Sequence, residues 1–181
     1  MSSTGRTTPW QAITVSAAEE TTARWLASTR PGDLVVLIGA SGAGKTTLLG
    51  SVPPHRVVSL DALRAGVSEP GDQSATPDAA VLQHLLLTMR LRRGATTYTD
   101  STSVDIHHRA QLVGLARQFG VRPVALLVGT ELEVCLQRNA ARPPATRVPE
   151  DEVRRQHALA LAAVATLPGE GFAEILHHRP A

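Results

Sequence analysis

The chain of 181 residues contains a single cysteine, Cys135, and a single lysine, Lys45. One thiol excludes an internal disulfide framework and any zinc site built from several thiolates. Aromatic residues make up only 3% of the chain, which argues against binding single strands mainly by stacking bases on aromatic side chains. No apolar run approaches the roughly 18 residues of a membrane span, and no apolar secretion segment follows the first nine residues. These absences predict a cytoplasmic protein without a membrane partner.

The basic residues are almost all arginine: of 18 lysines and arginines, only Lys45 is a lysine. Lys45 is therefore the one basic position, apart from histidines, at which the chain does not use arginine. The formal net charge is only +2, so a nucleic-acid partner would need clustered arginines rather than a basic surface overall. With 43% hydrophobic residues, the composition is globular. We expect a loose segment over 1–15 and a single domain over 16–181.

Short apolar segments alternate with helical patterns along the chain. The continuous apolar run 34–38 is typical of a strand buried on both faces of a parallel sheet. Alternating strands and helices form right-handed βαβ units, so we expect an α/β fold with a parallel five-stranded sheet between helix layers. The expected strands are 34–38, 56–60, 95–99, 123–128 and 172–176, and the expected helices are 16–28, 44–51, 76–93, 105–119, 131–139 and 149–167.

The segment after the first strand matches the phosphate-binding motif G-x-x-x-x-G-K-[ST]. Glycines let the backbone curl so that its N–H groups point at phosphate oxygens, and the following helix adds the positive end of its dipole. Lys45 would contact the β and γ phosphates, and Thr46 would supply a hydroxyl ligand to Mg²⁺. The predicted nucleotide-binding residues of this loop are Gly39, Ala40, Ser41, Gly42, Ala43, Gly44, Lys45, Thr46 and Thr47.

Three missing motifs narrow the reaction. The guanine-reading Asn-Lys-x-Asp motif is excluded because the only lysine is Lys45. Motor ATPases usually place a glutamate after the aspartate of the third strand, whereas Ser101 follows Asp100 here. The Leu-Ser-Gly-Gly-Gln signature of transporters is also missing. These absences favour a P-loop NTPase of the kinase type, which transfers phosphate to an acceptor other than water.

Such a transfer needs a base for the acceptor hydroxyl and cations near the moving phosphate. Asp61 closes the second expected strand beside the phosphate loop, and Arg64 follows three residues later. We interpret Asp61 as the base and Arg64 as a cation on the acceptor side. A helix cap at Asp61 and a solvated Arg64 remain as alternatives.

An arginine-rich and proline-rich segment, residues 138–149, is interpreted as a lid. Arg138 and Arg142 are four residues apart and would share one helical face. Their like charges repel at that spacing, and an anion bound between them would offset the repulsion. The prolines that follow indicate a hinged cover that brings these arginines onto the triphosphate when it closes. A solvated basic loop is the alternative reading of this segment.

Taken in order, several stretches resemble the kinase module of bacterial polynucleotide kinase-phosphatase. The resemblance covers roughly residues 33–177, and its most specific parts are the Ser-x-Asp-x-x-Arg-like element, the Asp-Gln-x-Ala-Thr stretch and the arginine-rich lid. It is carried by Val58–Arg64, Asp72–Thr76, Asp100–Ser103, Arg109–Leu112, Glu133–Pro143, Val148–Glu150, Arg154–His157 and Glu170–Phe172.

The resemblance implies ATP-dependent, Mg²⁺-dependent phosphorylation of a 5′-hydroxyl end of DNA or RNA, as in nucleic-acid repair. It implies that Asp61 is the general base and that Arg64 contacts the acceptor's phosphate. It also implies that Arg138 and Arg142 contact the ATP phosphates. Arg147 is a further lid arginine. The residues expected to bind the acceptor are Asp61, Arg64, Gln73, Thr76 and Asp100.

Two departures from the family pattern matter. Ser103 stands where the family has an asparagine. The chain ends at Ala181, which leaves no room for the family's phosphatase and adenylyltransferase modules, so separate end-processing enzymes would be its partners. The rival interpretation is a small-metabolite or antibiotic phosphotransferase on the same scaffold.

Overall fold

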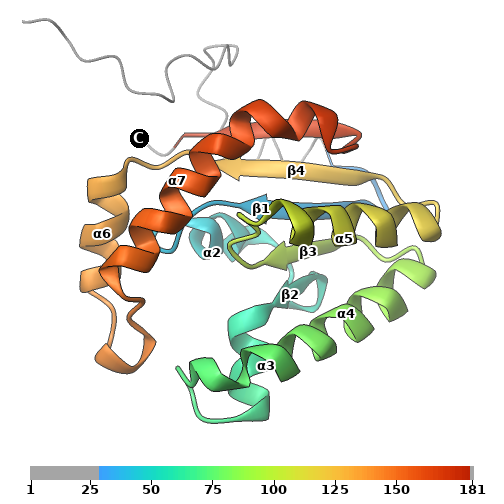
Figure 1. Ribbon diagram of the computed structural model, residues 1–181. Coiled ribbons are helices and arrows are strands. Elements are labelled where there is room, and N and C mark those ends of the chain that lie inside the picture. Colours follow the sequence, from blue (N-terminus) through green and yellow to red (C-terminus); the bar gives the residue numbers. More distant parts are fainter. Residues whose placement is uncertain (1–28, 180–181) are drawn as a thin grey trace, which may run out of the picture.

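The computed structural model describes residues 29–179, in which five strands alternate with helices (Figure 1). The expected loose segment at 1–15 and the expected helix at 16–28 lie outside the described residues. The strands are β1 (Leu34–Ile38), β2 (Val57–Ser59), β3 (Thr97–Asp100), β4 (Pro123–Val128) and β5 (Glu174–His178). The α-helices are α2 (Lys45–Leu48), α3 (Leu60–Val67), α4 (Thr76–Arg92), α5 (Ile106–Gln118), α6 (Leu132–Ala140) and α7 (Glu150–Thr166).

All five strands pair in parallel in the order β2-β3-β1-β4-β5. The predicted α/β fold with a parallel five-stranded sheet is therefore confirmed. The apolar run of β1 forms the centre of the sheet and is fully buried, as is nearly all of β4. Because the sheet is parallel, the carboxyl ends of β1, β2 and β3 lie at one edge, where ligands of such sheets bind.

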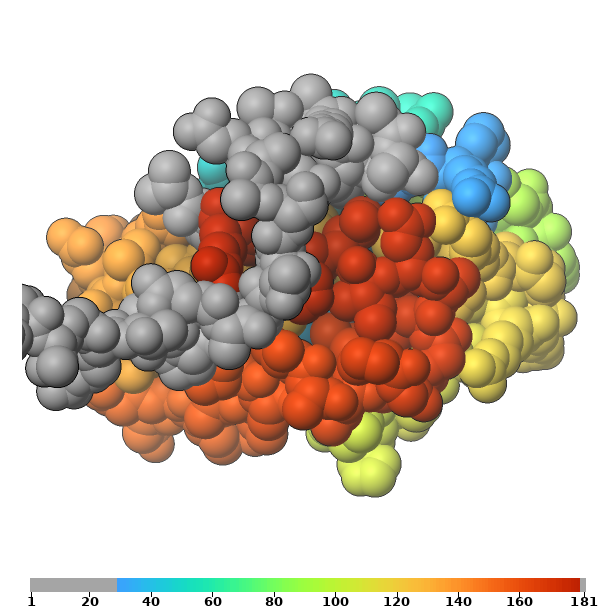
Figure 2. Space-filling model, turned by 90° about the horizontal axis from the view of Figure 1, so that it is seen from above, coloured from blue at the N-terminus to red at the C-terminus, as the bar shows by residue number. Residues whose placement is uncertain are grey.

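Alternate residues of β1 face two separate hydrophobic layers, as the two-residue period of a strand requires. Leu34, Val36 and Ile38 pack in one layer with Leu87 of α4 and Leu112 of α5. On the other face, Val35 and Leu37 pack against α2 and α6. Seen from above, the C-terminal residues lie at the molecular surface beside α7 (Figure 2), in agreement with the place of β5 at the edge of the sheet and its half-buried side chains.

The second strand is shorter than the sequence predicts. It ends at Ser59, and Leu60 and Asp61 already belong to α3. The Ser59 side chain accepts a hydrogen bond from the Ala62 N–H, so serine caps the helix and the cap alternative for Asp61 is wrong. Asp61 lies in the first turn of α3, and the same helix carries Arg64.

Helix α4 has an unusual distribution of apolar side chains. The apolar residues that recur at helical spacing along α4 are exposed, while the buried positions are Ala79, Gln83, Leu87 and Leu91. The exposed ones are Val81, Leu82, Leu85, Leu86 and Met89. Apolar residues on both sides are typical of a fully buried helix, yet α4 lies at the outer edge of the molecule (Figure 1).

Candidate active site

The phosphate loop is held open by glycines in left-handed conformations. Gly42 has φ 82° and Gly44 has φ 98°, a region that L side chains rarely occupy. A Cβ on Gly42 would lie 2.3 Å from the carbonyl oxygen of Cys135, so α6 packs directly on the loop and only glycine fits. Cys135 itself is fully buried, as expected for a small core residue.

Lys45 is buried at the start of α2 and folds back over the loop. Its Nζ donates to the carbonyl oxygens of Gly39 at 2.9 Å and Ala40 at 2.8 Å. Burial lowers the pKa of Lys45 to about 8, although the nearby Asp100 carboxylate opposes this shift. The ammonium group is therefore poised for an anionic ligand that would stabilise its charged form.

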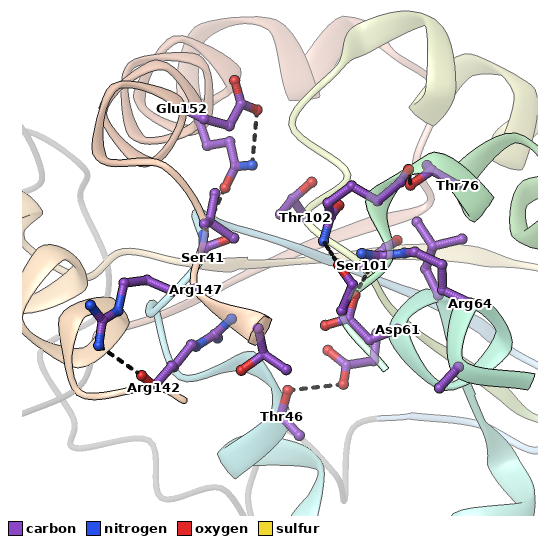
Figure 3. Close-up of a pocket in the computed structure, with 18 of the residues that line it drawn as sticks. Ser41, Thr46, Asp61, Arg64, Thr76, Ser101, Thr102, Arg142, Arg147 and Glu152 are labelled. Atoms are coloured by element: carbon purple, nitrogen blue, oxygen red, sulfur yellow. Dashed lines mark hydrogen bonds and ion pairs between the residues drawn. The ribbon is translucent and has the colours of Figure 1, made fainter. Parts of the chain in front are cut away.

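Thr46 and Asp100 join the loop to the end of β3. The Thr46 Oγ1 donates to Asp100 Oδ2 at 2.9 Å (Figure 3). Burial raises the pKa of Asp100, while the Thr46 hydrogen bond and Lys45 act in the opposite direction. A hydroxyl and a carboxylate are the hard oxygen ligands that Mg²⁺ prefers, so these two residues fit a magnesium ion bound together with phosphates.

Distant segments fix the backbone of the loop. The Ser41 N–H donates to Gln156 Oε1 of α7 at 2.9 Å, across 115 residues of sequence. The Gly39 N–H donates to the Thr102 carbonyl at 3.0 Å. The Thr130 Oγ1 donates to the Ala43 carbonyl at 2.7 Å. The sequence analysis gave Gln156, Thr102 and Thr130 no role, because no local pattern signals a contact between such distant segments.

The loop after β3 has its own support. Ser103 adopts φ 44°, a left-handed conformation in which asparagine is favoured over most residues. Arg109, almost fully buried, donates to the Ser103 and Val104 carbonyls and pairs with Glu170 at 2.6 Å. Ser103 is thus held through its backbone carbonyl.

Two pockets of about 540 Å³ each meet at Lys45, Thr46 and Arg142, which line both. The first, here called the nucleotide pocket, lies along the phosphate loop and is also lined by Gly42, Ala43, Gly44, Thr47, Leu48, Arg138 and His178. The second, the acceptor pocket, is also lined by Ser41, Leu60, Asp61, Arg64, Ala65, Pro70, Gly71, Gln73, Thr76, Asp100, Ser101, Thr102, Thr146, Arg147, Val148, Pro149, Glu152 and Gln156.

Asp61 and Arg64 form an ion pair in the acceptor pocket (Figure 3). The Asp61 side chain is 77% exposed, whereas Arg64 is buried with 10% of its side chain accessible. Among the described residues, the buried Nε of Arg64 has no hydrogen-bond partner. The carboxylate is therefore open to the pocket, and the guanidinium keeps one donor unused.

The lid arginines divide between the pockets. Arg138 of α6 lies over the loop, with Nη1 at 3.4 Å from the Gly42 carbonyl oxygen. Arg142 lies beyond the end of α6, so the two do not share a helix, yet both line the nucleotide pocket. Arg147 lines the acceptor pocket and donates to the Arg142 carbonyl at 3.0 Å.

Two loops meet at one side of the acceptor pocket. Gln73 and Thr76, which the sequence analysis expects to bind the acceptor, both line this pocket, and the Thr76 hydroxyl donates to the Gln73 carbonyl at 2.7 Å. Next to them, Gly71 has φ 92°, and a Cβ there would lie 2.0 Å from the carbonyl oxygen of Ala145. The loop before α4 therefore touches the lid directly.

The fold also matches that of solved structures at low sequence identity. A candidate kinase from Chloroflexus aurantiacus superposes with a TM-score of 0.58 at 16% identity, over 83% of this chain and 89% of that one. The PezAT toxin–antitoxin system of Streptococcus pneumoniae gives 0.63 at 18% identity, over 87% and 74%. The AvrRxo1-ORF1:ORF2 complex with ATP gives 0.63 at 15% identity, over 80% of this chain and 52% of that one.

These likenesses agree with the predicted P-loop NTPase kinase fold. No curated protein matches the chain in sequence. Within residues 29–179, no helix is both long and apolar enough to cross a bilayer. The AAA domain model matches residues 34–167, which include the phosphate loop, the Asp61–Arg64 pair and the lid. The chain therefore belongs to the AAA domain family.

Proposed function

We propose that the protein is an ATP-dependent kinase that transfers the γ-phosphate to an alcohol. One observation carries the proposal: Lys45 lies between two pockets, one lined by the phosphate loop and the other containing an exposed carboxylate at Asp61. A water-activating ATPase has no need of a second pocket of about 540 Å³. A pure nucleotide switch has no need of Asp61 there.

The nucleotide side supplies charge neutralisation. The loop N–H groups and Lys45 would hold the phosphates, and Arg138 and Arg142 would approach from the lid. Thr46 and Asp100 would hold Mg²⁺, which neutralises charge on the phosphate oxygens as the transfer proceeds. Asp100, expected on the acceptor side, is thus better used on the metal side, although it also lines the acceptor pocket.

The acceptor side supplies the base. Asp61 accepts the proton of the acceptor hydroxyl as its oxygen attacks the γ-phosphorus. The bond between that phosphorus and the β–γ bridging oxygen breaks, and ADP leaves with the electron pair. Arg64 orients Asp61 toward the pocket through their ion pair.

The preferred acceptor is a 5′-hydroxyl end of DNA or RNA. The support is Arg64, which lines the pocket and whose guanidinium suits a phosphate on the acceptor. The order of motifs over 33–177, which resembles the polynucleotide kinase module, supports the same acceptor. Separate end-processing enzymes would then be partners in repair.

A second candidate acceptor is a small metabolite or antibiotic alcohol. The observation that favours it is the contact between Gly71 and Ala145, which closes the acceptor pocket on the side lined by Gly71 and Thr146. A compact acceptor would fit in the pocket while the two loops stay in contact, whereas a polynucleotide would require them to separate. The two candidates therefore differ in whether the lid must open while the acceptor is bound.

A labelling experiment separates the two acceptors. The full chain is incubated with γ-labelled ATP and Mg²⁺, together with 5′-hydroxyl oligonucleotides in one series and a panel of small alcohols in another. Label on the oligonucleotide end supports the first candidate, and label on a small molecule alone supports the second. Label released only as inorganic phosphate contradicts the kinase proposal.

Asp61→Asn tests the base. The amide keeps the shape but accepts no proton, so turnover should fall about 10²- to 10⁴-fold. Titration with a fluorescent ATP analogue should show nucleotide affinity changed by less than about threefold, because Asp61 lines only the acceptor pocket. Turnover near that of the wild type would contradict the assignment of Asp61.

A further inference from the structure

The exposed face of α4 is built like one half of a helix pair. Asp78, Leu82, Leu85, Met89 and Arg92 follow one another at alternating steps of four and three residues. This is the a/d spacing of a coiled-coil seam. All five are exposed, with Leu85 at 48% and Met89 at 43%. Val81, the most exposed large apolar residue of the helix at 68%, borders the same stripe.

The stripe is complementary to itself in only one direction. Asp78 and Arg92 lie seven residues before and after Leu85, which is about 10 Å along the helix axis on either side. An antiparallel pair with its two-fold axis at Leu85 would set Asp78 of one copy against Arg92 of the other, twice. A parallel pair would place like charges together. Val81 would face Met89 of the other copy.

We propose that the protein forms a symmetric homodimer in which two α4 helices pack antiparallel about Leu85. The interface is isologous, as expected of a closed dimer. It covers apolar side chains that the monomer leaves in water on a helix whose opposite face is already buried in the core. The helix that pairs also contributes Thr76 at its first residue to the acceptor pocket.

The oligomeric state of the full chain tests the proposal. Sedimentation velocity over a concentration series should give a dimer for the wild type. Leu85→Asp would bury two like charges at the axis and should raise the dissociation constant at least about 100-fold. Circular dichroism of this surface variant should match the wild type. A monomeric wild type overturns the proposal, whatever covers the face, and so does a dimer that Leu85→Asp leaves unchanged.

Charge reversal tests the direction of packing. Asp78→Arg and Arg92→Asp should each weaken the dimer by about tenfold or more, and the double variant should regain most of the lost affinity. If the double variant is weaker than both single variants, the antiparallel register is wrong.

Cysteine cross-linking gives an independent readout, because the native Cys135 is fully buried. Under mild oxidation, Leu85→Cys should form a disulfide-linked dimer. Val81→Cys should link to Met89→Cys in a mixture but not to itself. His84→Cys, exposed on the same helix but off the stripe, is the matched control and should stay unlinked. Linkage of His84→Cys alone overturns the proposed interface.

Discussion

The two pockets on either side of Lys45 are built in different ways. Apart from the two lid arginines and His178, the nucleotide pocket is lined by the contiguous residues 42–48. The acceptor pocket is assembled from Ser41, Lys45 and Thr46 of the phosphate loop and α2 together with α3, the loop before α4, the end of β3, the lid and α7. A local motif thus supplies most of the lining of one pocket, whereas the lining of the other comes from segments far apart in the sequence. Acceptor specificity can therefore change while the phosphate loop stays the same.

Lys45→Ala should have the largest effect, because Lys45 lines both pockets and would neutralise the moving phosphate. We expect phosphate transfer from labelled ATP to fall roughly 10³-fold or more. Lys45→Arg is the matched control for charge alone. It should restore little activity, since a planar guanidinium cannot reproduce the two hydrogen bonds to the Gly39 and Ala40 carbonyls. Full activity in either variant would show that the Lys45 ammonium is not needed for phosphate transfer.

Arg64→Ala should affect one pocket only. Loss of a charge-assisted contact to the acceptor should raise the acceptor KM about 10- to 100-fold. The KM for ATP should stay within about twofold, because Arg64 does not line the nucleotide pocket. Arg154→Ala, which removes an exposed arginine of α7, is the control and should change neither constant. Equal losses for both substrates would mean that the two pockets are not separable.

The smallest expected effect is the pH dependence of ATP binding, which tests the contribution of Lys45 to the nucleotide pocket. The pKa of Lys45 in the free protein is about 8, well below its ordinary value. Below pH 8 the ammonium is already charged, whereas at higher pH ATP binding must be accompanied by proton uptake. Affinity for ATP, measured by calorimetry, should therefore be about tenfold lower at pH 9 than at pH 7. Lys45→Ala should abolish this dependence.

The parts of the fold that depend on local pattern were predictable. The strand 123–128 has the predicted bounds, and the helix expected at 105–119 is found at Ile106–Gln118. The phosphate motif, flanked by an apolar strand and a helix, predicted the nucleotide side of the site. The sequence also predicted that Asp61 and Arg64 lie together, although both belong to α3 and Asp61 does not end the strand.

What the sequence analysis missed depends on tertiary contacts. The Gln156 bond to Ser41 joins segments 115 residues apart. The contact of Gly71 with Ala145 depends on how the lid folds over the loop before α4. In α4 the apolar spacing predicted the helix but not the buried face, because both sides carry apolar side chains. Only packing decides which side faces the sheet.

The close contact between Gly42 and Cys135 has a consequence for how the proposed lid would move. Since the Cys135 carbonyl fills the space beside Gly42, α6 packs directly against the phosphate loop. Opening of the proposed lid would therefore pivot beyond Ala140, where α6 ends, and would swing Arg142 and Arg147 away while Arg138 stays in place. One arginine would then act as a permanent part of the cradle, and the other two would arrive with each catalytic cycle.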